Sequence, residues 1–189
     1  LKRLEYRGYD SAGVIVEGED KKFDLRKTKG KVSDLVEISK DLEGFAHIGM
    51  GHTRWATHGV PSDRNSHPHL SNNEKIAIIH NGIIENYDTI KTMLIEKGFT
   101  FASDTDTEVL VNLIQYIMDT QNVDFPTAVR YALNEVYGAY AITVMHKDYP
   151  GVLVVGRLGS PLAIGVGENE YFIASDASPF VEFTKEAIY

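Results

Sequence analysis

Histidines cluster in one part of the chain. Six of the seven lie between residues 47 and 80, and the single tryptophan, Trp55, lies among them. Imidazole is the commonest protein ligand for metal ions. No two of these histidines have the i, i+4 spacing of a His-Glu-x-x-His helix, however, and no Asp or Glu is an obvious third ligand. We therefore expect no metal site, and interpret His47, His52 and His80 as hydrogen-bonded strand residues.

Arg54 ends a predicted strand and enters a polar loop through the sequence Arg-Trp-Ala-Thr-His-Gly. A guanidinium there can form two parallel charge-assisted hydrogen bonds with a carboxylate, and the Thr57 hydroxyl can reach the same oxygens. These residues predict a clamp for a carboxylate. The alternative is a surface arginine beside a core tryptophan, and the residues alone do not separate the two.

Asn81 and Gly82 follow the apolar run IAIIH. Asn-Gly is the strongest two-residue signal for a hairpin turn of type I′. The pair could instead form an oxyanion hole, in which the Asn amide donates one N–H and glycine lets a backbone N–H approach the developing charge. The flanking runs are apolar throughout rather than alternating, which favours a buried site.

Asp106 lies in the first turn of a predicted helix. An acid in this place complements the helix dipole, which is its usual role. Beside an arginine clamp, its carboxylate would also let one site bind both the amino and the carboxyl group of an amino acid. Residues 7–13 form a further helix-to-strand turn that is dense in polar groups.

The elements that must position these residues can be predicted from periodicity, caps and turns. Helices are expected near 32–42, from Asn86 to Gly98, after the capping-box pair Thr105 and Glu108, and after Asp124. Strands are expected near 11–17, 22–28, 46–54, 75–80, 138–146, 151–156, 161–166 and 170–175. Strands, then helices, then strands joined by short turns indicate an α+β fold with mainly antiparallel sheet.

Composition excludes several classes of protein. The 189 residues have a formal charge of −8 with scattered Lys and Arg, so a nucleic-acid partner is disfavoured. Apolar runs such as GVLVVG are far shorter than the roughly 20 residues of a membrane span, so we expect no membrane segment. We find no linker or repeat, and we expect residues 1–189 to be a single domain, truncated at both ends from a longer polypeptide.

Five motifs, taken together and in this order, resemble the glutaminase domain of the glucosamine-6-phosphate synthase family, a group of class II glutamine amidotransferases. They are EYRGYDSAG (5–13), GHTRWATHG (51–59), HPH (67–69), HNGIIEN (80–86) and SDTDTEV (103–109). Sister class II amidotransferases are expected to carry His-Arg-Gly where this chain has Tyr6-Arg7-Gly8. They remain the alternative within the same group.

The resemblance implies an N-terminal-nucleophile hydrolase fold, a four-layer αββα sandwich with two mainly antiparallel sheets. It also implies roles for named residues. Asn81 and Gly82 match the oxyanion hole, Arg54 and Asp106 match the groups that hold the carboxylate and ammonium of glutamine, and Thr57 and His58 match neighbouring contacts. Trp55 matches a residue associated with passing ammonia onward, Arg7 lies near the nucleophile, and His67 is expected near the glutamine site.

One departure from the family affects activity. Members use a cysteine at the mature N-terminus as nucleophile, and this sequence contains no cysteine. We therefore expect these residues to be inactive by themselves, and a non-catalytic glutamine-binding domain is the second alternative. The resemblance further implies a cytoplasmic, homo-oligomeric parent enzyme without a cofactor, whose C-terminal isomerase domains bind fructose 6-phosphate and receive ammonia from L-glutamine.

Overall fold

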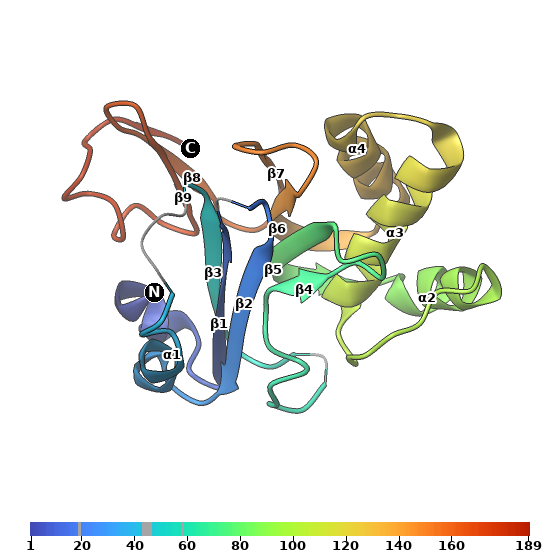
Figure 1. Ribbon diagram of the computed structural model, residues 1–189, viewed down its shortest axis with the longest axis horizontal. Coiled ribbons are helices and arrows are strands. Elements are labelled where there is room, and N and C mark those ends of the chain that lie inside the picture. The colour runs from blue at the N-terminus through green and yellow to red at the C-terminus, as the bar shows by residue number, and fades with distance from the viewer. Residues whose placement is uncertain (19, 43–46, 58) are drawn as a thin grey trace.

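The computed structural model describes residues 1–18, 20–42, 47–57 and 59–189, and it stacks two antiparallel sheets between helices (Figure 1). The first sheet has the order β2-β1-β3, with β1 Ser11–Glu17, β2 Phe23–Lys29 and β3 Gly49–Arg54. The second sheet has the order β4-β5-β6-β7, with β4 His69–Leu70, β5 Ile76–Ile84, β6 Gly138–His146 and β7 Leu153–Leu158. Every neighbouring pair in both sheets is antiparallel.

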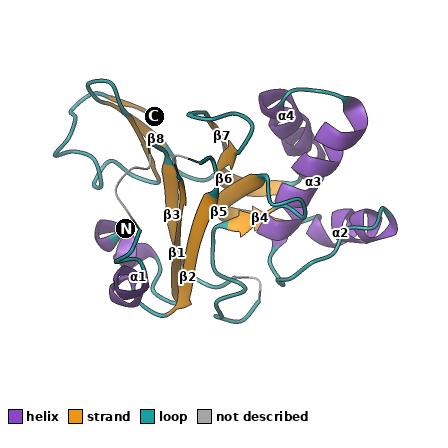
Figure 2. Cartoon of the chain, in the orientation of Figure 1, coloured by secondary structure: helices purple, strands orange, loops and turns teal. Residues whose placement is uncertain are grey.

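Helices cover the two outer faces of this pair of sheets, as the colours of Figure 2 show. The short helix α1 (Val32–Ile38) packs on the first sheet. The second sheet is covered by α2 (Tyr87–Glu96), α3 (Asp106–Gln121) and α4 (Phe125–Glu135). A 3-10 helix, η1 (Lys2–Arg7), precedes β1, and a small third sheet has the order β10-β8-β9, with β8 Ala163–Val166, β9 Tyr171–Ala174 and β10 Ala187–Ile188.

Each interface between layers has its own apolar core. Val32 and Leu35 of α1 pack on Ala12, while Ile15 on the other face of β1 packs with Met50 and residues of the second sheet. The largest core lies between the second sheet and the helices and is centred on α3. Successive residues of a strand face opposite sides, so a strand between two layers must be apolar on both.

This alternation also decides where the polar residues of β3 go. Met50 faces the second sheet, and His52 and Arg54 follow at two-residue intervals on the same face. Arg54 pairs with Ser11 and His52 pairs with Gly13 in the antiparallel register. The end of β3 therefore directs a charged side chain into the space between the sheets.

The predicted α+β class and antiparallel sheets are confirmed, and β1 and β6 have the predicted bounds. Other boundaries differ. Helix α1 ends at Ile38, and β3 begins at Gly49, which leaves His47 exposed ahead of the strand and not in it. Asn86 does not cap α2 with its side chain, because its amide instead bonds to Glu135 O and to the N–H of Tyr137.

Candidate active site

A pocket of about 350 Å³ opens between the two sheets, at the end where β3 and β5 bring polar side chains together. Among the residues that line it are eight that the sequence analysis predicted for the site: Arg7, Arg54, Trp55, Thr57, His67, Asn81, Gly82 and Asp106. His58 lies outside the described residues. Residues from η1, β3, β5 and α3 thus meet at one cavity although more than 90 positions separate the first from the last.

Arg54 is buried, with 4% of its surface exposed, whereas its neighbour Trp55 is 58% exposed. The interpretation of a surface arginine beside a core tryptophan is therefore wrong. One guanidinium nitrogen, Nη2, donates to the carbonyl oxygen of Gly59 over 3.2 Å. Burial lowers the pKa of Arg54, and the carboxylates of Asp106 and Asp10 oppose that shift. The guanidinium is thus a buried cation under the electrostatic influence of two carboxylates, of which Asp106 also lines the pocket.

Asn81 and Gly82 lie within β5, where they pair with Ala141 and Tyr140 of β6. The hairpin-turn interpretation is therefore wrong. Gly82 has φ +144°, and a β-carbon there would lie 2.0 Å from the Ala139 carbonyl oxygen. Only glycine fits this close approach of two strands.

Asp106 opens α3, whose N-cap Thr105 accepts a hydrogen bond from the Glu108 N–H. The Asp106 side chain is buried, and Oδ2 accepts a hydrogen bond from the backbone N–H of Ile84 over 2.8 Å. His80 Nδ1 lies 3.9 Å from the same oxygen. The carboxylate is thus held at the positive end of the helix dipole, where it lines the pocket.

Four of the histidines form a layer at the pocket, which His52, His67 and His80 line; His52 is partly buried, and His67, His69 and His80 are buried. His52 stacks on His67 with ring centroids 4.4 Å apart, and His67 meets His69 edge-on at 4.9 Å. His67 Nδ1 accepts from the His80 N–H, and the hydroxyls of Thr107 and Thr105 lie 3.0 and 3.1 Å from ring nitrogens of His80 and His69. Burial lowers the pKa of His52 to about 3 and lowers the pKa values of His67 and His69 well below 6.5.

These three rings are therefore neutral near pH 7, and their polar partners are threonine hydroxyls and backbone. Within the described part of the chain, no group of three His, Asp or Glu side chains is arranged to hold a metal ion. In the same residues no helix is long and apolar enough to cross a membrane.

Arg7 reaches the pocket from η1, and it forms a 3.8 Å ion pair with Asp176 near the C-terminal end of the chain. The Tyr6 hydroxyl donates to the same carboxylate over 2.7 Å. Trp55 stands at the same side and meets the ring of Tyr9 edge-on, with centroids 5.4 Å apart. Of these two exposed aromatic side chains, Trp55 lines the pocket and Tyr9 packs against Trp55.

Sequence reasoning missed three residues that organise the pocket. Asp10 accepts a hydrogen bond from the Ala56 N–H over 2.9 Å and so fixes the chain directly after Arg54. Thr107 contacts His80, and Asn65 connects the loop after β3 to the residues before α3. The polar turn at 7–13 was a signal for Asp10, but no local pattern pointed to Thr107 or Asn65.

Comparisons with known proteins agree with this fold and pocket. The profile of the glutamine amidotransferase domain family matches residues 12–187, so the chain belongs to this family. A solved glutamine phosphoribosylpyrophosphate amidotransferase from B. subtilis superposes with a TM-score of 0.81 at 26% identity, over 95% of this chain and 38% of that one. The N-terminal-nucleophile hydrolase fold implied by the motifs is thereby confirmed.

Two relatives are more similar to this chain in sequence than that solved structure is. The chain is 54% identical over 191 aligned residues to a protein of Bacteroides thetaiotaomicron named glutamine–fructose-6-phosphate aminotransferase [isomerizing]. It is 48% identical to a protein of the same name from Thermococcus kodakarensis. All of this chain is covered in both cases, and it spans 31% of the length of each relative.

Proposed function

We propose that these residues form the glutamine-hydrolysing part of an enzyme that makes glucosamine 6-phosphate from fructose 6-phosphate. The observation that carries the proposal is the meeting of buried Arg54 and buried Asp106 at one small pocket, with Asn81 and Gly82 beside them. An L-amino acid carries a carboxylate and an ammonium at fixed separation. A buried cation and a buried anion that line the same cavity are complementary to that pair.

Each pocket residue then has a chemical task. Arg54 and the Thr57 hydroxyl bind the α-carboxylate of glutamine, and Asp106 binds its α-ammonium. The side-chain amide of the substrate is directed toward Asn81 and Gly82, where N–H groups stabilise the negative oxygen of a tetrahedral intermediate. Collapse of that intermediate expels ammonia and leaves an acyl group on the nucleophile, and water then releases glutamate.

The nucleophile of this family is a thiol, and the 189 residues contain no cysteine. We therefore propose that they do not turn over glutamine by themselves and act together with a thiol from outside this stretch. The names of the relatives, of which the chain spans 31%, support an acceptor site for fructose 6-phosphate elsewhere in the polypeptide. The full enzyme in this proposal is cytoplasmic and homo-oligomeric, and it needs no metal or organic cofactor.

Glutamine hydrolysis by the full-length protein tests this function. We expect glutamate release that fructose 6-phosphate stimulates, with glucosamine 6-phosphate as product. Absence of glutamate release would contradict the proposed function, and release without any effect of the sugar phosphate would favour a sister class of amidotransferase.

The 189 residues alone offer a second test. We expect calorimetric titration to show binding of L-glutamate, with no ammonia produced from L-glutamine. Binding without turnover is also the behaviour of a non-catalytic glutamine-binding domain, the alternative that the missing cysteine favours. Activity of the full-length protein separates the two.

A further inference from the structure

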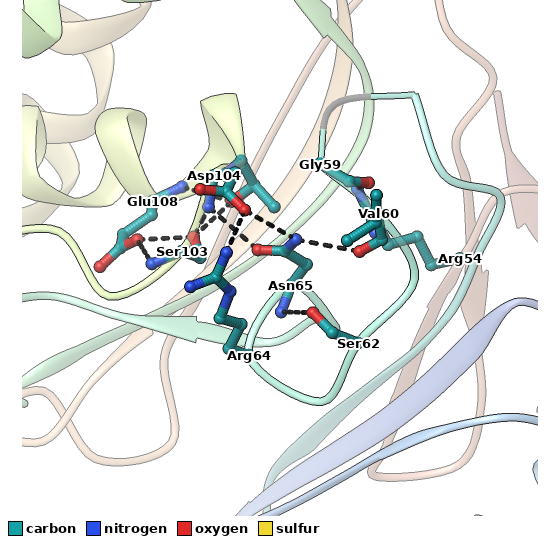
Figure 3. Close-up of polar contacts among 10 residues, drawn as sticks. Arg54, Gly59, Val60, Ser62, Arg64, Asn65, Ser103, Asp104 and Glu108 are labelled. Carbon is teal, nitrogen blue, oxygen red and sulfur yellow. Dashed lines mark hydrogen bonds and ion pairs between the residues drawn. The ribbon is translucent and has the colours of Figure 1, made fainter.

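Asn65 does not line the pocket, and it is fully buried, with 0% of its surface exposed. Its amide group joins two segments that are far apart in the sequence (Figure 3). Nδ2 donates to the Val60 carbonyl oxygen over 2.9 Å and to Asp104 Oδ2 over 3.2 Å, and Oδ1 accepts from the Asp104 N–H over 2.9 Å. A buried amide with this many bonds across two loops fixes their separation.

One side of this connection leads to Arg54. Gly59, whose carbonyl oxygen accepts the Arg54 Nη2 hydrogen bond, packs directly on the Asn65 amide. Gly59 has φ +78°, and a β-carbon there would lie 2.6 Å from Asn65 Nδ2 and 3.0 Å from Asp104 Cβ. The Gly59 backbone, which orients the Arg54 guanidinium, therefore packs against the Asn65 side chain and leaves no room for a β-carbon between them.

The other side leads to Asp106. Asp104 lies two residues before Asp106, in the segment that enters α3. Its carboxylate also accepts a hydrogen bond from Arg64 Nη2 over 2.6 Å, and the bonds from Asn65 and Arg64 lower the pKa of Asp104. The Glu108 carboxylate holds the preceding residues by accepting from the N–H groups of Ala102 and Ser103. Asp104 is thus part of a short hydrogen-bonded segment that runs directly into the first turn of α3.

We propose that Asn65 is a positioning residue that sets the separation between the Arg54 guanidinium and the Asp106 carboxylate, and thereby the affinity of the pocket for the α-amino-acid end of glutamine. This inference rests on the proposed function. The carboxylate and ammonium of glutamine do not change charge during hydrolysis. A group that positions their binding partners therefore stabilises the bound substrate and the transition state equally, which affects KM and leaves kcat nearly unchanged.

Kinetics of the full-length protein test the inference. We expect Asn65→Ala to raise KM for glutamine by about tenfold or more and to change kcat by less than about twofold, since it removes several buried hydrogen bonds at once. Arg64 is exposed, and Arg64→Ala removes only its hydrogen bond to the Asp104 carboxylate. We expect this variant to raise KM for glutamine by about two- to threefold. It serves as the second test if Asn65→Ala does not fold.

Asn72 provides a matched control, because its amide also joins two segments. Its Nδ2 donates to Thr100 O over 2.8 Å and its Oδ1 accepts from the Thr100 N–H over 2.9 Å, but it does not line the pocket. We expect Asn72→Ala to lower the melting temperature and to leave KM for glutamine unchanged.

The possible failures are distinguishable. If the unmodified protein releases no glutamate from glutamine, the proposed function itself is wrong. If it is active, an unchanged KM in both Asn65→Ala and Arg64→Ala overturns the role of Asn65. A loss confined to kcat, or an equal rise of KM in Asn72→Ala, overturns it as well.

Discussion

The backbone N–H of Ile84 donates to Asp106 Oδ2 over 2.8 Å, and this bond joins the strand that carries Asn81 and Gly82 to the first turn of α3. The carboxylate that would bind the ammonium of glutamine is thus positioned by the same strand that would stabilise the oxyanion. Arg54 is oriented separately, through Gly59 and the loop that Asn65 holds. The two ends of the substrate are therefore held by parts of the fold that meet only after both sheets have formed.

Asp106→Asn tests the charge of this carboxylate apart from its structural bond. The Asn oxygen can still accept from the Ile84 N–H, so folding should be retained, while the attraction to an ammonium is lost. A hydrogen bond to a charged group contributes about 1.5–3 kcal/mol, so we expect KM for glutamine to rise about 10- to 100-fold in steady-state kinetics.

Asp124→Asn is the matched control for Asp106→Asn, because Asp124 also stands at a helix N-terminus and accepts from the Thr127 N–H, away from the pocket. We expect its KM to equal that of the unmodified protein. If Asp106→Asn also has the KM of the unmodified protein, Asp106 does not bind the ammonium of glutamine.

Arg54→Lys tests the carboxylate clamp. An ammonium keeps the positive charge but cannot form two parallel hydrogen bonds with a carboxylate while a second nitrogen donates to the Gly59 carbonyl oxygen, as Nη2 of Arg54 does. We expect kcat/KM for glutamine in the full-length protein to fall by about tenfold or more. Arg26→Lys, on the edge strand β2 beside Asp24 and Asp41 and away from the pocket, should leave it unchanged. Unaltered kinetics in Arg54→Lys would contradict the clamp.

Gly82→Ala tests the close approach of β5 and β6. The added methyl group would lie 2.0 Å from the Ala139 carbonyl oxygen at φ +144°. We expect it to lower the free energy of unfolding by at least about 3 kcal/mol in urea denaturation. Gly98→Ala is the comparison, since Gly98 has φ +90° and open space around its α-carbon. It should lose about 1–2 kcal/mol, and equal losses would show that contact with Ala139 is unimportant.

The sequence predicted those parts of the fold that local patterns decide. The apolar run of β1, the long strand β6 and the apolar stripe of α3 were each visible without long-range information. Asn81-Gly82 was ambiguous because Asn-Gly is a local turn signal, and only pairing with residues 140–141 keeps it in a strand. The burial of Arg54 and exposure of Trp55 likewise reverse what the hydrophobicity of each residue would suggest.

Tertiary contacts explain what the sequence did not predict. The Asn65 amide meets Asp104 from 39 positions away, and Asp10 meets Ala56 from 46. No periodicity or cap connects such residues, because the contact exists only after the sheets have stacked. Resemblance to the family motifs predicted most of the residues that line the pocket. The residues that hold these in place became apparent only from their hydrogen bonds in the structure.

The buried histidine layer makes stability depend on pH. Burial lowers the pKa values of His67 and His69 well below 6.5, the value expected in the unfolded chain, and the pKa of buried His146 is shifted in the same direction. As pH falls below about 6.5, the unfolded state therefore binds more protons than the folded state. The stabilisation is complete above about pH 7 and is lost as the pH falls, by up to about 1.4 kcal/mol per pH unit for each histidine that stays neutral when folded.

Urea unfolding of the chain between pH 7.5 and pH 5 measures this loss, because that range lies above the usual pKa of carboxylates. We expect the unfolding midpoint to fall steadily below pH 6.5. In His69→Gln the side-chain amide can still bond to the Thr105 hydroxyl but cannot take up a proton, so its midpoint should depend less on pH. Equal midpoints at pH 7.5 and 5 in the unmodified chain would mean that the buried rings accept protons without disturbing the layer. Asp106 lies 3.9 Å from one of these rings, so loss of the layer at low pH should also weaken L-glutamate binding over the same range.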